Sequence, residues 1–560
     1  MAGKTSDKQG DLVFLALGGV GEIGMNLAVY GLGTGRRRRY IAVDMGVAFG
    51  HENLPGVEAV LPDIAWLEER ADRLEAIFVT HAHEDHFGAL FDFWPRFKVP
   101  VYMTAFAAGL LEAKRAGEPG APDIPVTVVR QGERVSAGPF EVEYVPVSHS
   151  IPEPNALVIR SFAGTVLHSG DWKIDPTPGL GLPIDEARLA AIGEEGVHAL
   201  VCDSTNAVRE GISPSEADVA EVLKDIIAKA RHRVCVTTFA SNVARLRAVA
   251  EAAAAAGRDV VIVGRAIQRA VDVASELGYL DGLPPFLRQD AYGYLPRDKV
   301  VALMTGSQGE PRAALARIVS GDHPAVALSA GDTVIFSSRT IPGNERAVNA
   351  IINGLIDLGA EVITDRLGLV HVSGHPRREE LRRLYDLVKP QVLVPVHGEA
   401  LHLHEHAKLG RAAGIGEVVE VRNGDLARLW PSPGEVLSKV GAGQLYRDGR
   451  LLLEPERSGV EERRKLAFAG AVFVSLVMTE KGAVADDPEL VLVGLPGRDG
   501  EGEPMQALLE DVVDETVEQL PKPKRRDEAS LREAVRRAVR SQVGQIWGKK
   551  PFVAVTVSYM

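Results

Sequence analysis

One segment of the chain, His81-Ala82-His83-Glu84-Asp85-His86, places three imidazoles and two carboxylates within six consecutive residues. The apolar and β-branched run 76–80 comes directly before it and predicts a buried strand. We therefore expect the segment on the loop just beyond a strand end, where functional residues concentrate. Imidazole and carboxylate groups together suit a borderline divalent ion such as zinc or manganese. A solvated histidine-rich loop is the alternative, but the dense pattern favours a site for two metal ions.

Size and composition predict a large globular protein of about three or four domains. The chain has 560 residues, of which 46% are hydrophobic. Its cysteines, Cys202 and Cys235, both stand in apolar runs, which predicts buried thiols in a reducing compartment and no disulfide framework. The polar stretch 1–10 and the lack of a long apolar run predict a cytoplasmic protein with no membrane segment.

The formal net charge of −13 argues against a general polyanion binder, because nucleic-acid-binding domains are usually basic. The objection is limited, since part of the acidity belongs to candidate metal ligands whose bound cations would reverse the local field. A protein that holds a nucleic acid in a groove needs only local positive charge. The basic run 521–526 could contact RNA, although a solvated linker is the simpler interpretation.

Strand and helix patterns divide the chain into successive regions. Residues 11–201 alternate short strands, turns and helices, whereas 213–362 contain longer helices. Within this second region, helix patterns at 214–230 and 242–256 alternate with strand patterns at 233–237 and 259–263. This alternation predicts an inserted α/β layer. A strand pattern resumes at 391–396. After the proline- and glycine-rich stretch 431–460 comes a last unit with strands and a helix, at 471–478, 528–547 and 552–558.

A segment near the N-terminus, Gly19-Val20-Gly21-Glu22-Ile23-Gly24, matches the GxGxxG fingerprint of dinucleotide-binding folds. That fingerprint requires a helix whose N-terminus faces the phosphates. Here the following residues, 26–30 and 39–44, flank a glycine-rich turn and predict a β-hairpin instead. We therefore expect no nucleotide-binding site at this position.

Further candidate ligands follow later strand patterns. His149 follows the alternating run 140–147, Asp171 follows 165–170, and His397 follows the apolar run 392–396. A single histidine or aspartate at a strand end is more often structural than metal-binding. Three of them in a chain that also holds the 81–86 segment favour a shared metal centre.

These motifs resemble those of the metallo-β-lactamase superfamily. The pattern His-x-His-x-Asp-His at 81–86, the lone His149 and Gly170-Asp171 match its metal-binding motifs, and Asp44 matches an early Asp-x-Gly that supports the metal loop. A long insert separates Asp171 from His397, as in the nucleic-acid-processing β-CASP group. Further strings narrow the resemblance to bacterial ribonuclease J: 202–206 (CDSTN), 239–242 (FASN), 306–311 (GSQGEP), 341–345 (IPGNE), 371–375 (HVSGH) and 395–399 (PVHGE).

The resemblance implies an α/β fold, namely a metallo-β-lactamase αβ/βα sandwich with an inserted β-CASP α/β domain and a small C-terminal α+β domain. It covers residues 10–440 strongly and the C-terminal hundred residues only in outline. We expect the first part of the sandwich at 1–205, the insert at 206–362 and the second part of the sandwich at 363–440. A linker at 441–460 and an oligomerisation domain at 461–560 would follow.

The resemblance also implies a site for two divalent ions, zinc first, with manganese or magnesium as alternatives. One ion would be held by His81, His83 and His149 and the other by Asp85, His86 and His397, with Asp171 bridging them. Asp203 and His375 match catalytic residues of the group and would assist proton transfer. The substrate would contact Ser241, Asn242 and the 371–375 loop, where a terminal 5′-monophosphate would bind His371, Val372, Ser373, Gly374 and His375.

The implied activity is hydrolysis of RNA phosphodiesters by a 5′-to-3′ exonuclease that prefers 5′-monophosphate ends and has some endonuclease activity, in RNA decay and maturation, including that of rRNA. A purely endonucleolytic or DNA-directed β-CASP nuclease is the main alternative. A scaffold of RNA decay is disfavoured because every ligand position is filled, and a small-molecule hydrolase because the large insert suits a polymer. The expected partners are RNA, further copies of the chain in a homodimer or homotetramer, and RNA-decay proteins; 552–558 is a candidate strand for pairing between copies.

Overall fold

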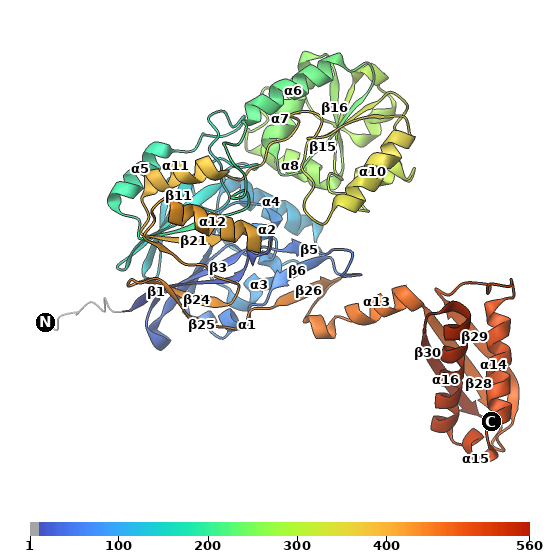
Figure 1. The fold of residues 1–560 in the computed structure, drawn as a ribbon. Helices are drawn as coiled ribbons and strands as arrows, with labels where there is room; N and C mark the ends of the chain where they lie inside the picture. Colours follow the sequence, from blue (N-terminus) through green and yellow to red (C-terminus); the bar gives the residue numbers. More distant parts are fainter. Residues whose placement is uncertain (1–9) are drawn as a thin grey trace. The chain divides into compact units, whose positions relative to one another are not determined.

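The structure is a computed structural model that describes residues 10–560. Its described part divides into compact units, which Figure 1 shows in colours that follow the sequence. One unit comprises Val60–Leu445 together with the chain up to Phe49, and the other comprises Gly50–Ala59 and Tyr446–Met560. The boundary at Leu445 falls inside the segment 441–460, which the sequence assigned to a linker.

A mixed sheet carries the N-terminal strands of the first unit. From edge to edge it runs through β25 (Glu435–Lys439), β24 (Asp425–Trp430), β1 (Asp11–Gly18), β3 (Leu27–Gly33), β4 (Arg39–Val43), β7 (Leu74–Phe78), β8 (Val101–Met103) and β9 (Val126–Val128). β3 and β4 pair antiparallel, with Val29 opposite Ala42. The GxGxxG segment is therefore followed by a β-hairpin, as predicted, and no phosphate-facing helix begins there.

A second sheet faces the first across the main core. Its strands are, from edge to edge, β10 (Arg134–Ala137), β11 (Phe140–Pro146), β12 (Asn155–Ser161), β13 (Gly164–His168), β14 (Ala199–Asp203), β21 (Val392–Val396) and β23 (Glu417–Val418). Phe14 and Phe78 of the first sheet belong to the same buried cluster as Tyr144 and Val394 of the second. Apolar side chains on the facing sides of both sheets thus make one sandwich core.

Helices cover the outer face of this second sheet. Leu189, Leu384 and Leu409 pack in one cluster with Leu200 and Leu393 of the sheet. These side chains come from α5 (Glu186–Glu195), α11 (Arg378–Val388) and α12 (Ala400–Ala412). Helices that follow strands of the first sheet are α1 (Ala65–Glu68), α2 (Glu84–Phe87), α3 (Leu90–Phe97) and α4 (Ala105–Gly117). The layers therefore form the αβ/βα sandwich that the resemblance implied.

The insert between β14 and β21 is an α/β layer with its own parallel sheet. In spatial order its strands are β17 (Leu287–Arg288), β16 (Asp259–Val263), β18 (Val300–Met304), β15 (Val234–Thr237), β19 (Thr333–Phe336) and β20 (Glu361–Ile363). Its helices are α6 (Glu216–Lys229), α7 (Val243–Ala255), α8 (Arg265–Glu276), α9 (Ala314–Val319) and α10 (Glu345–Asp357). Because the strands are parallel, their carboxyl ends share one edge, and the loops at that edge carry the FASN and GSQGEP strings.

The C-terminal unit packs helices against one face of a small sheet. Its elements are α13 (Val460–Ala469), β28 (Ala471–Met478), β29 (Val484–Val493), α14 (Met505–Gln519), α15 (Lys522–Arg525), α16 (Glu528–Trp547) and β30 (Phe552–Tyr559). β28 is central, and β30 pairs with it at an edge of the sheet. Leu509 of α14 and Val539 of α16 pack on Val474 of β28. The basic run includes the short helix α15, which is mostly exposed and connects α14 to α16.

Short strands lie outside these layers, at β2 (Val20–Gly21), β5 (Ala48–Phe49), β6 (Ala59–Pro62), β22 (Gly398–Glu399), β26 (Gln444–Asp448) and β27 (Leu451–Leu453). β2 pairs with β22 and so brings the end of the GxGxxG segment beside the residues that follow His397. Within residues 10–560, no helix combines the length and the apolar composition that crossing a membrane requires.

Candidate metal centre

The loop that follows β7 carries the 81–86 segment, and Asp44 holds that loop in place. Asp44 follows β4, the neighbour of β7, with a backbone φ of +64°. Its carboxylate accepts hydrogen bonds from the backbone N–H of Thr80 at 2.8 Å and from the Thr80 hydroxyl at 2.9 Å. It also lies 2.7 Å from Nδ1 of His86. Asp44 therefore fixes both the entrance of the loop and one imidazole within it.

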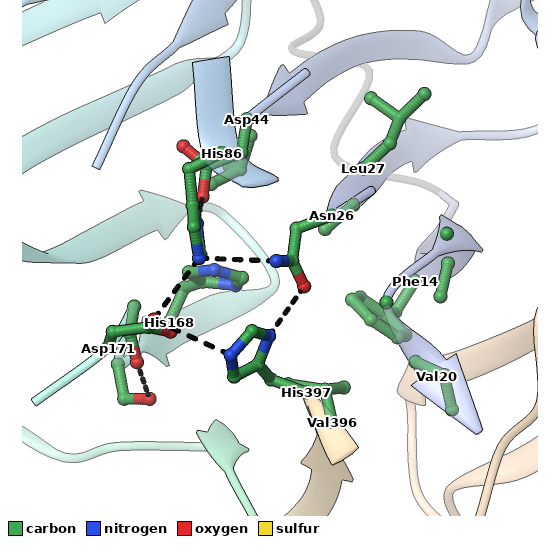
Figure 2. Close-up of a pocket in the computed structure, with 17 residues that line it drawn as sticks. Phe14, Val20, Asn26, Leu27, Asp44, His86, His168, Asp171, Val396 and His397 are labelled. Carbon is green, nitrogen blue, oxygen red and sulfur yellow. Dashed lines mark hydrogen bonds and ion pairs between the residues drawn. The ribbon is translucent and has the colours of Figure 1, made fainter. Parts of the chain in front are cut away.

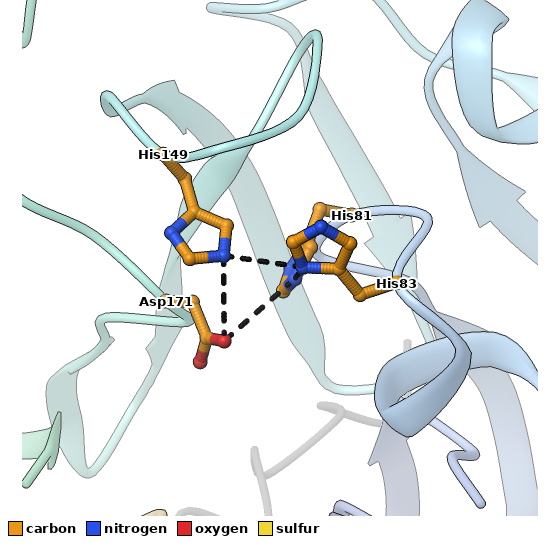
Figure 3. Close-up of side chains that lie close together, drawn as sticks. All are labelled: His81, His83, His149 and Asp171. Carbon is orange, nitrogen blue, oxygen red and sulfur yellow. Dashed lines mark hydrogen bonds and ion pairs between the residues drawn. The ribbon is translucent and has the colours of Figure 1, made fainter. Parts of the chain in front are cut away.

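A first group of predicted ligands lies together in Figure 3: His81, His83, His149 and Asp171. Nδ1 of His83 lies 3.0 Å from Nε2 of His81 and 3.2 Å from Nε2 of His149. Oδ2 of Asp171 lies 3.6 Å from Nε2 of His149 and 3.8 Å from Nε2 of His81. Ligand atoms that each lie about 2 Å from one zinc ion are separated by similar distances. The group therefore has the donors and the spacing that a single divalent ion needs.

A second group combines Asp85, His86, Asp171 and His397. Oδ2 of Asp171 lies 3.2 Å from Nε2 of His86 and 3.5 Å from Nε2 of His397. Oδ2 of Asp85 lies 3.5 Å from Nε2 of His86. Because Asp171 belongs to both groups, the seven predicted ligands form one continuous centre around its carboxylate. Figure 2 shows His86, Asp171 and His397 of this group together with Asn26.

Hydrogen bonds behind the imidazoles orient them. Nδ1 of His397 lies 2.8 Å from Oδ1 of Asn26, and Nδ1 of His149 lies 2.7 Å from the backbone carbonyl of Gly374. The carboxylate of Asp44 occupies the same position behind His86. Since these oxygens only accept, each Nδ1 carries a proton, and the Nε2 of each ring faces Asp171. Partners of this kind fix ligand histidines at metal sites.

Burial makes three of the imidazoles neutral. It lowers the pKa of His83 to about 4 and holds the pKa of His81 and of His149 well below its usual value. Neutral imidazoles are the form that binds a metal ion. Nδ1 of His83 faces Nε2 of both His81 and His149, and its single proton can serve only one of these contacts, so lone pairs remain for a cation. The donor set of this group therefore fits a divalent ion.

Carboxylates dominate the electrostatics of the second group. Burial lowers the pKa of His86, but Asp171, Asp85 and Asp44 outweigh that effect and hold it well above the usual value. Burial disfavours the charge on Asp171, yet His397 and His86 hold the pKa of this carboxyl well below its usual range. The field at Nε2 of His86 thus favours positive charge, which a metal ion supplies as well as a proton does.

The predicted catalytic pair lies at the rim of the centre. Nδ1 of His375 is 2.7 Å from Oδ2 of Asp203 and 4.0 Å from Oδ2 of Asp171. The other oxygen of Asp203 accepts hydrogen bonds from the backbone N–H and the hydroxyl of Thr205. Burial lowers the pKa of His375, but the carboxylates of Asp203 and Asp171 more than compensate and raise it to about 9. His375 therefore lies beside both groups of ligands with Asp203 as its hydrogen-bond partner.

The loop 371–375 joins this pair to the first group. Asn206 donates from its side-chain amide to Oγ of Ser373 at 2.9 Å and to the carbonyl of His375 at 3.1 Å. Because Oγ of Ser373 accepts there, its hydroxyl proton stays available to another acceptor. Nδ1 of His371 is buried and has no hydrogen-bond partner among residues 10–560. Val372 is buried and anchors the loop.

The predicted substrate contacts Ser241 and Asn242 differ in their surroundings. Asn242 is buried, and its side-chain oxygen accepts a hydrogen bond from the backbone N–H of Arg245 at 3.0 Å, which caps α7. Ser241 is only partly buried. The structure thus gives Asn242 a role in the helix start, and Ser241 is the more accessible of the two.

Sequence reasoning missed the residues that hold the ligands from behind. Asn26 orients His397 although 371 positions separate them in the chain. The one feature of the sequence that could have indicated Asn26 is its place just after the GxGxxG segment. The pairing of β2 with β22 brings that segment beside the residues that follow His397. The backbone carbonyl of Gly374 carries no signal in the residue type at all, because any residue has one.

Comparison with known proteins matches family models over most of the chain. The matches are the metallo-beta-lactamase superfamily (residues 51–195), the ribonuclease J beta-CASP domain (231–355), the Zn-dependent metallo-hydrolase RNA specificity domain (361–421) and the ribonuclease J C-terminal domain (458–560). A crystal structure of a protein of unknown function from Enterococcus faecalis V583 has a TM-score of 0.50 and 17% identity, and covers 74% of this chain and 99% of that one. That likeness supports the fold alone.

Curated relatives match almost the entire chain. Ribonuclease J of Sinorhizobium meliloti is 58% identical over 548 residues, which cover 98% of this chain and 97% of the relative. Ribonuclease J of Mycolicibacterium smegmatis is 38% identical over 553 residues, with the same coverage of 98% and 97%. Ribonuclease J of Mycobacterium tuberculosis is 36% identical over 557 residues. Both units of the structure are included in these matches, and this chain is a member of the ribonuclease J family.

Proposed function

We propose that this protein degrades RNA from its 5′ end, with a preference for a 5′-monophosphate and with some endonuclease activity. Membership of the ribonuclease J family makes it a metal-dependent ribonuclease. The observation that supports the finer proposal is the position of the 371–375 loop, whose Gly374 carbonyl lies 2.7 Å from a candidate ligand, His149. A phosphate bound by that loop would lie close to the metal centre.

The metal centre supplies the hydrolytic chemistry. Divalent ions bound by the His81 and His86 groups would provide Lewis acidity for attack of water on phosphorus. Zinc is the first candidate because imidazole nitrogens predominate among the donors, and manganese or magnesium are alternatives with the same ligands. Asp171 would stand between both ions, since its carboxylate belongs to both groups.

Asp203 and His375 would move and position protons. Nδ1 of His375 contacts Asp203 at 2.7 Å, so Nε2 of the same ring is free to face the scissile phosphate. A charged imidazole there can donate a proton to the 3′ oxygen as it leaves, and Asp203 stabilises that charge. Assistance of this kind typically accelerates a reaction by about 10²–10⁴-fold.

The 371–375 loop would recognise the terminal phosphate. Its free donor is the Ser373 hydroxyl, a group that hydrogen-bonds phosphate oxygens. Burial lowers the pKa of His371 to about 3, so this neighbouring ring is neutral. A 5′-triphosphate would extend further into this enclosed loop than a monophosphate does. The proposed preference for monophosphate ends follows from that difference in size and charge.

We also propose that copies of the chain associate through the C-terminal unit. One face of its sheet is covered by α14 and α16. The strands also carry exposed apolar side chains, namely Phe473, Val491 and Phe552. β30 forms an edge of the same sheet. An exposed apolar sheet face and an unpaired edge both favour association. Removal of the chain after residue 455 should lower the mass seen by light scattering; an unchanged mass would exclude this role.

The proposed setting is the cytoplasm, where RNA-decay proteins would be further partners. Cys202 and Cys235 are both free and buried, which suits a reducing compartment. Burial raises the pKa of Cys235 to about 12, so this thiol is unreactive.

The decisive experiment is a time course on RNA labelled at its 5′ end that carries either one or three 5′ phosphates, with zinc or manganese added. Immediate release of labelled mononucleotide from the monophosphate form alone is the expected result. Internal fragments from both forms would establish an endonuclease and remove the phosphate role of the 371–375 loop. A matched DNA substrate tests the alternative of a DNA-directed nuclease, because equal cutting of DNA and RNA would contradict the proposal.

A further inference from the structure

Glu153 joins three parts of the structure with one carboxylate. It lies in the loop between β11 and β12, shortly after the candidate ligand His149. Its Oε2 accepts a hydrogen bond at 2.8 Å from the backbone N–H of Phe106, in the first turn of α4. Its Oε1 accepts a hydrogen bond at 2.6 Å from the hydroxyl of Tyr279, which follows α8 of the insert. The carboxylate therefore links the loop that carries His149 to α4 and to the insert.

Both hydrogen bonds suit a charged carboxylate. The first backbone N–H groups of a helix have no partner within the helix, and the positive end of the helix dipole favours an anion there. Burial and the Glu153 carboxylate raise the pKa of Tyr279, so its hydroxyl keeps its proton at neutral pH and donates it to the hydrogen bond. Hydrogen bonds to an ionised acceptor are roughly twice as strong as those between neutral groups. Glu153 can therefore hold both partners in place.

The backbone at Glu153 has an unusual conformation. Its φ is +54°, in the left-handed region that residues other than glycine rarely adopt. Asn155 fixes the same loop from the other side, because its side-chain amide donates to the carbonyl of Glu153 at 2.7 Å and its backbone N–H donates to the carbonyl of Thr80 at 3.2 Å. Thr80 directly precedes the 81–86 segment. A strained residue persists only where its surroundings fix it, so the loop that carries His149 has a defined position beside that segment.

α4 reaches both loops that carry candidate ligands of the first group. Its first turn donates to Glu153 in the His149 loop, and near its other end Nζ of Lys114 lies 2.8 Å from Oε2 of Glu84. Glu84 belongs to the 81–86 segment. The side chain of Lys114 is mostly buried, so solvent screens this ion pair less than it screens a surface pair. The position of α4 therefore acts on both loops.

The insert packs directly on α4. Figure 1 shows α4 beside α8, and an added Cβ on Gly109 of α4 would lie 2.7 Å from Cγ1 of Val273 of α8. Glycine thus lets these helices approach closely. The rings of Phe106 and Tyr279 also meet edge to face, with their centroids 6.1 Å apart. Tyr279 therefore reaches Glu153 from a part of the insert that α4 already holds.

We propose that Glu153 is a positioning residue for the metal centre, through which α4 and the insert fix the imidazole of His149 in the first group of ligands. The inference rests on the proposed function, since the centre that it concerns is the one proposed to hydrolyse RNA. His149 would bind the ion, whereas Glu153 acts through the loop that both residues share. Loss of the Glu153 carboxylate should therefore lower the affinity for metal without removing a ligand.

The test measures the zinc affinity of the full-length protein, which is stripped with a chelator and titrated with zinc against a competing dye. Glu153→Ala should weaken zinc binding by about tenfold, at the lower end of the loss that follows removal of a partner orienting a metal ligand. Tyr279→Phe removes only the hydrogen bond from the insert and should weaken zinc binding by about 2–5-fold. With excess zinc, both variants should regain most of the wild-type rate of RNA cleavage, because no ligand and no proton donor is missing.

Glu153→Gly separates the carboxylate from the backbone. Glycine adopts the positive φ without strain, so this variant loses the hydrogen bonds but keeps the conformation of the loop. It should lose zinc affinity as Glu153→Ala does. Full zinc affinity in Glu153→Gly would overturn the proposal, because the effect of alanine would then come from backbone strain.

Glu118→Gln and Tyr294→Phe are the matched controls, because Glu118 is an exposed carboxylate at the other end of α4 and Tyr294 is an exposed tyrosine of the insert. Both should bind zinc as the wild type does. The proposal is wrong if Glu153→Ala binds zinc as tightly as these controls, even where its metal-free form unfolds in less urea, since Glu153 would then only stabilise the fold. Failure of the wild type to cleave any RNA would refute the proposed function, whereas cleavage with unchanged zinc affinity in the Glu153 variants would refute this inference alone.

Discussion

The backbone carbonyl of Gly374 accepts a hydrogen bond from Nδ1 of His149 at 2.7 Å. This bond joins the 371–375 loop to the first group of candidate metal ligands. Because Nδ1 carries the proton, Nε2 of His149 turns its lone pair toward Asp171 and His83. The position of the loop therefore sets the orientation of the imidazole, so the loop proposed to bind phosphate and a candidate metal ligand share one contact.

Replacing Gly374 with alanine should weaken the metal centre. An added Cβ would lie 2.4 Å from Nδ1 and 2.6 Å from Cε1 of His149, so the ring or the loop must move. Loss of a partner that orients a metal ligand typically costs about 10–100-fold in metal affinity or activity. Gly374→Ala should therefore contain less bound metal after dialysis, as measured by mass spectrometry of the eluted ions, and should cleave RNA more slowly.

Gly368→Ala is the control for this variant. Gly368 lies shortly before the same loop, and an added Cβ would meet only Cγ1 of Val370, at 4.0 Å. This second variant should keep its metal and its activity. If Gly374→Ala also retained its full metal content and its full rate of RNA cleavage, the hydrogen bond to His149 would contribute to neither metal binding nor activity.

The Asp203–His375 pair should act on the chemical step and not on metal binding. His375→Ala is expected to lower the rate of cleavage by about 10²–10⁴-fold while leaving two ions per chain. Asp203, His375 and His397 also lie close enough together to hold an ion, so metal content is the discriminating measurement. A parallel loss of metal and activity would make His375 a ligand instead of a proton donor.

The sequence was sufficient to select the candidate ligands because each one is marked locally. The dense 81–86 segment and three single residues at strand ends are visible in the order of residues, and the structure brings all seven within two groups. The layers were predictable for a similar reason, since 260–263 and 392–396 are continuous apolar runs and lie in β16 and β21.

What the sequence could not show depends on contacts between distant residues. Asn26 and the Gly374 carbonyl orient ligands that lie far away in the chain, and neither has a distinctive neighbourhood. Asn242 was predicted from its motif to contact RNA, but a helix cap uses the same residue type.

Arg245 should stabilise the base of the 371–375 loop through a buried ion pair. It is fully buried, lies 2.7 Å from Oε2 of Glu216, and donates to the carbonyl of Val370 at 3.0 Å. Arg245→Met leaves the Glu216 carboxylate buried without a cation, which should cost about 3–5 kcal/mol of stability. The double variant Arg245→Met/Glu216→Leu removes both charges and should recover much of that loss in urea unfolding. A double variant no more stable than the single one would contradict this account.

His406 should make the protein less stable in mild acid. The ring is fully buried on α12, its Nδ1 lies 2.8 Å from Oγ of Ser204, and Nε2 has no partner among residues 10–560. Burial lowers its pKa to about 4 from an ordinary value of 6.5, so the folded state holds the neutral ring. Between pH 6.5 and pH 4 the unfolded chain binds the proton more readily than the folded one. The contribution of His406 to stability is therefore complete above pH 6.5 and falls by about 3 kcal/mol as the pH approaches 4.

The variant His406→Gln isolates this effect, because an amide can still hydrogen-bond Ser204 but does not titrate in this range. Its free energy of unfolding should fall less steeply than that of the wild type between pH 6.5 and 4. His404→Gln is the matched control, since His404 is exposed on the same helix and its removal should leave the pH dependence unchanged. Identical slopes for the wild type and His406→Gln would mean that the acid sensitivity comes from other groups, the candidate metal ligands first among them, because histidines must also be neutral to bind an ion.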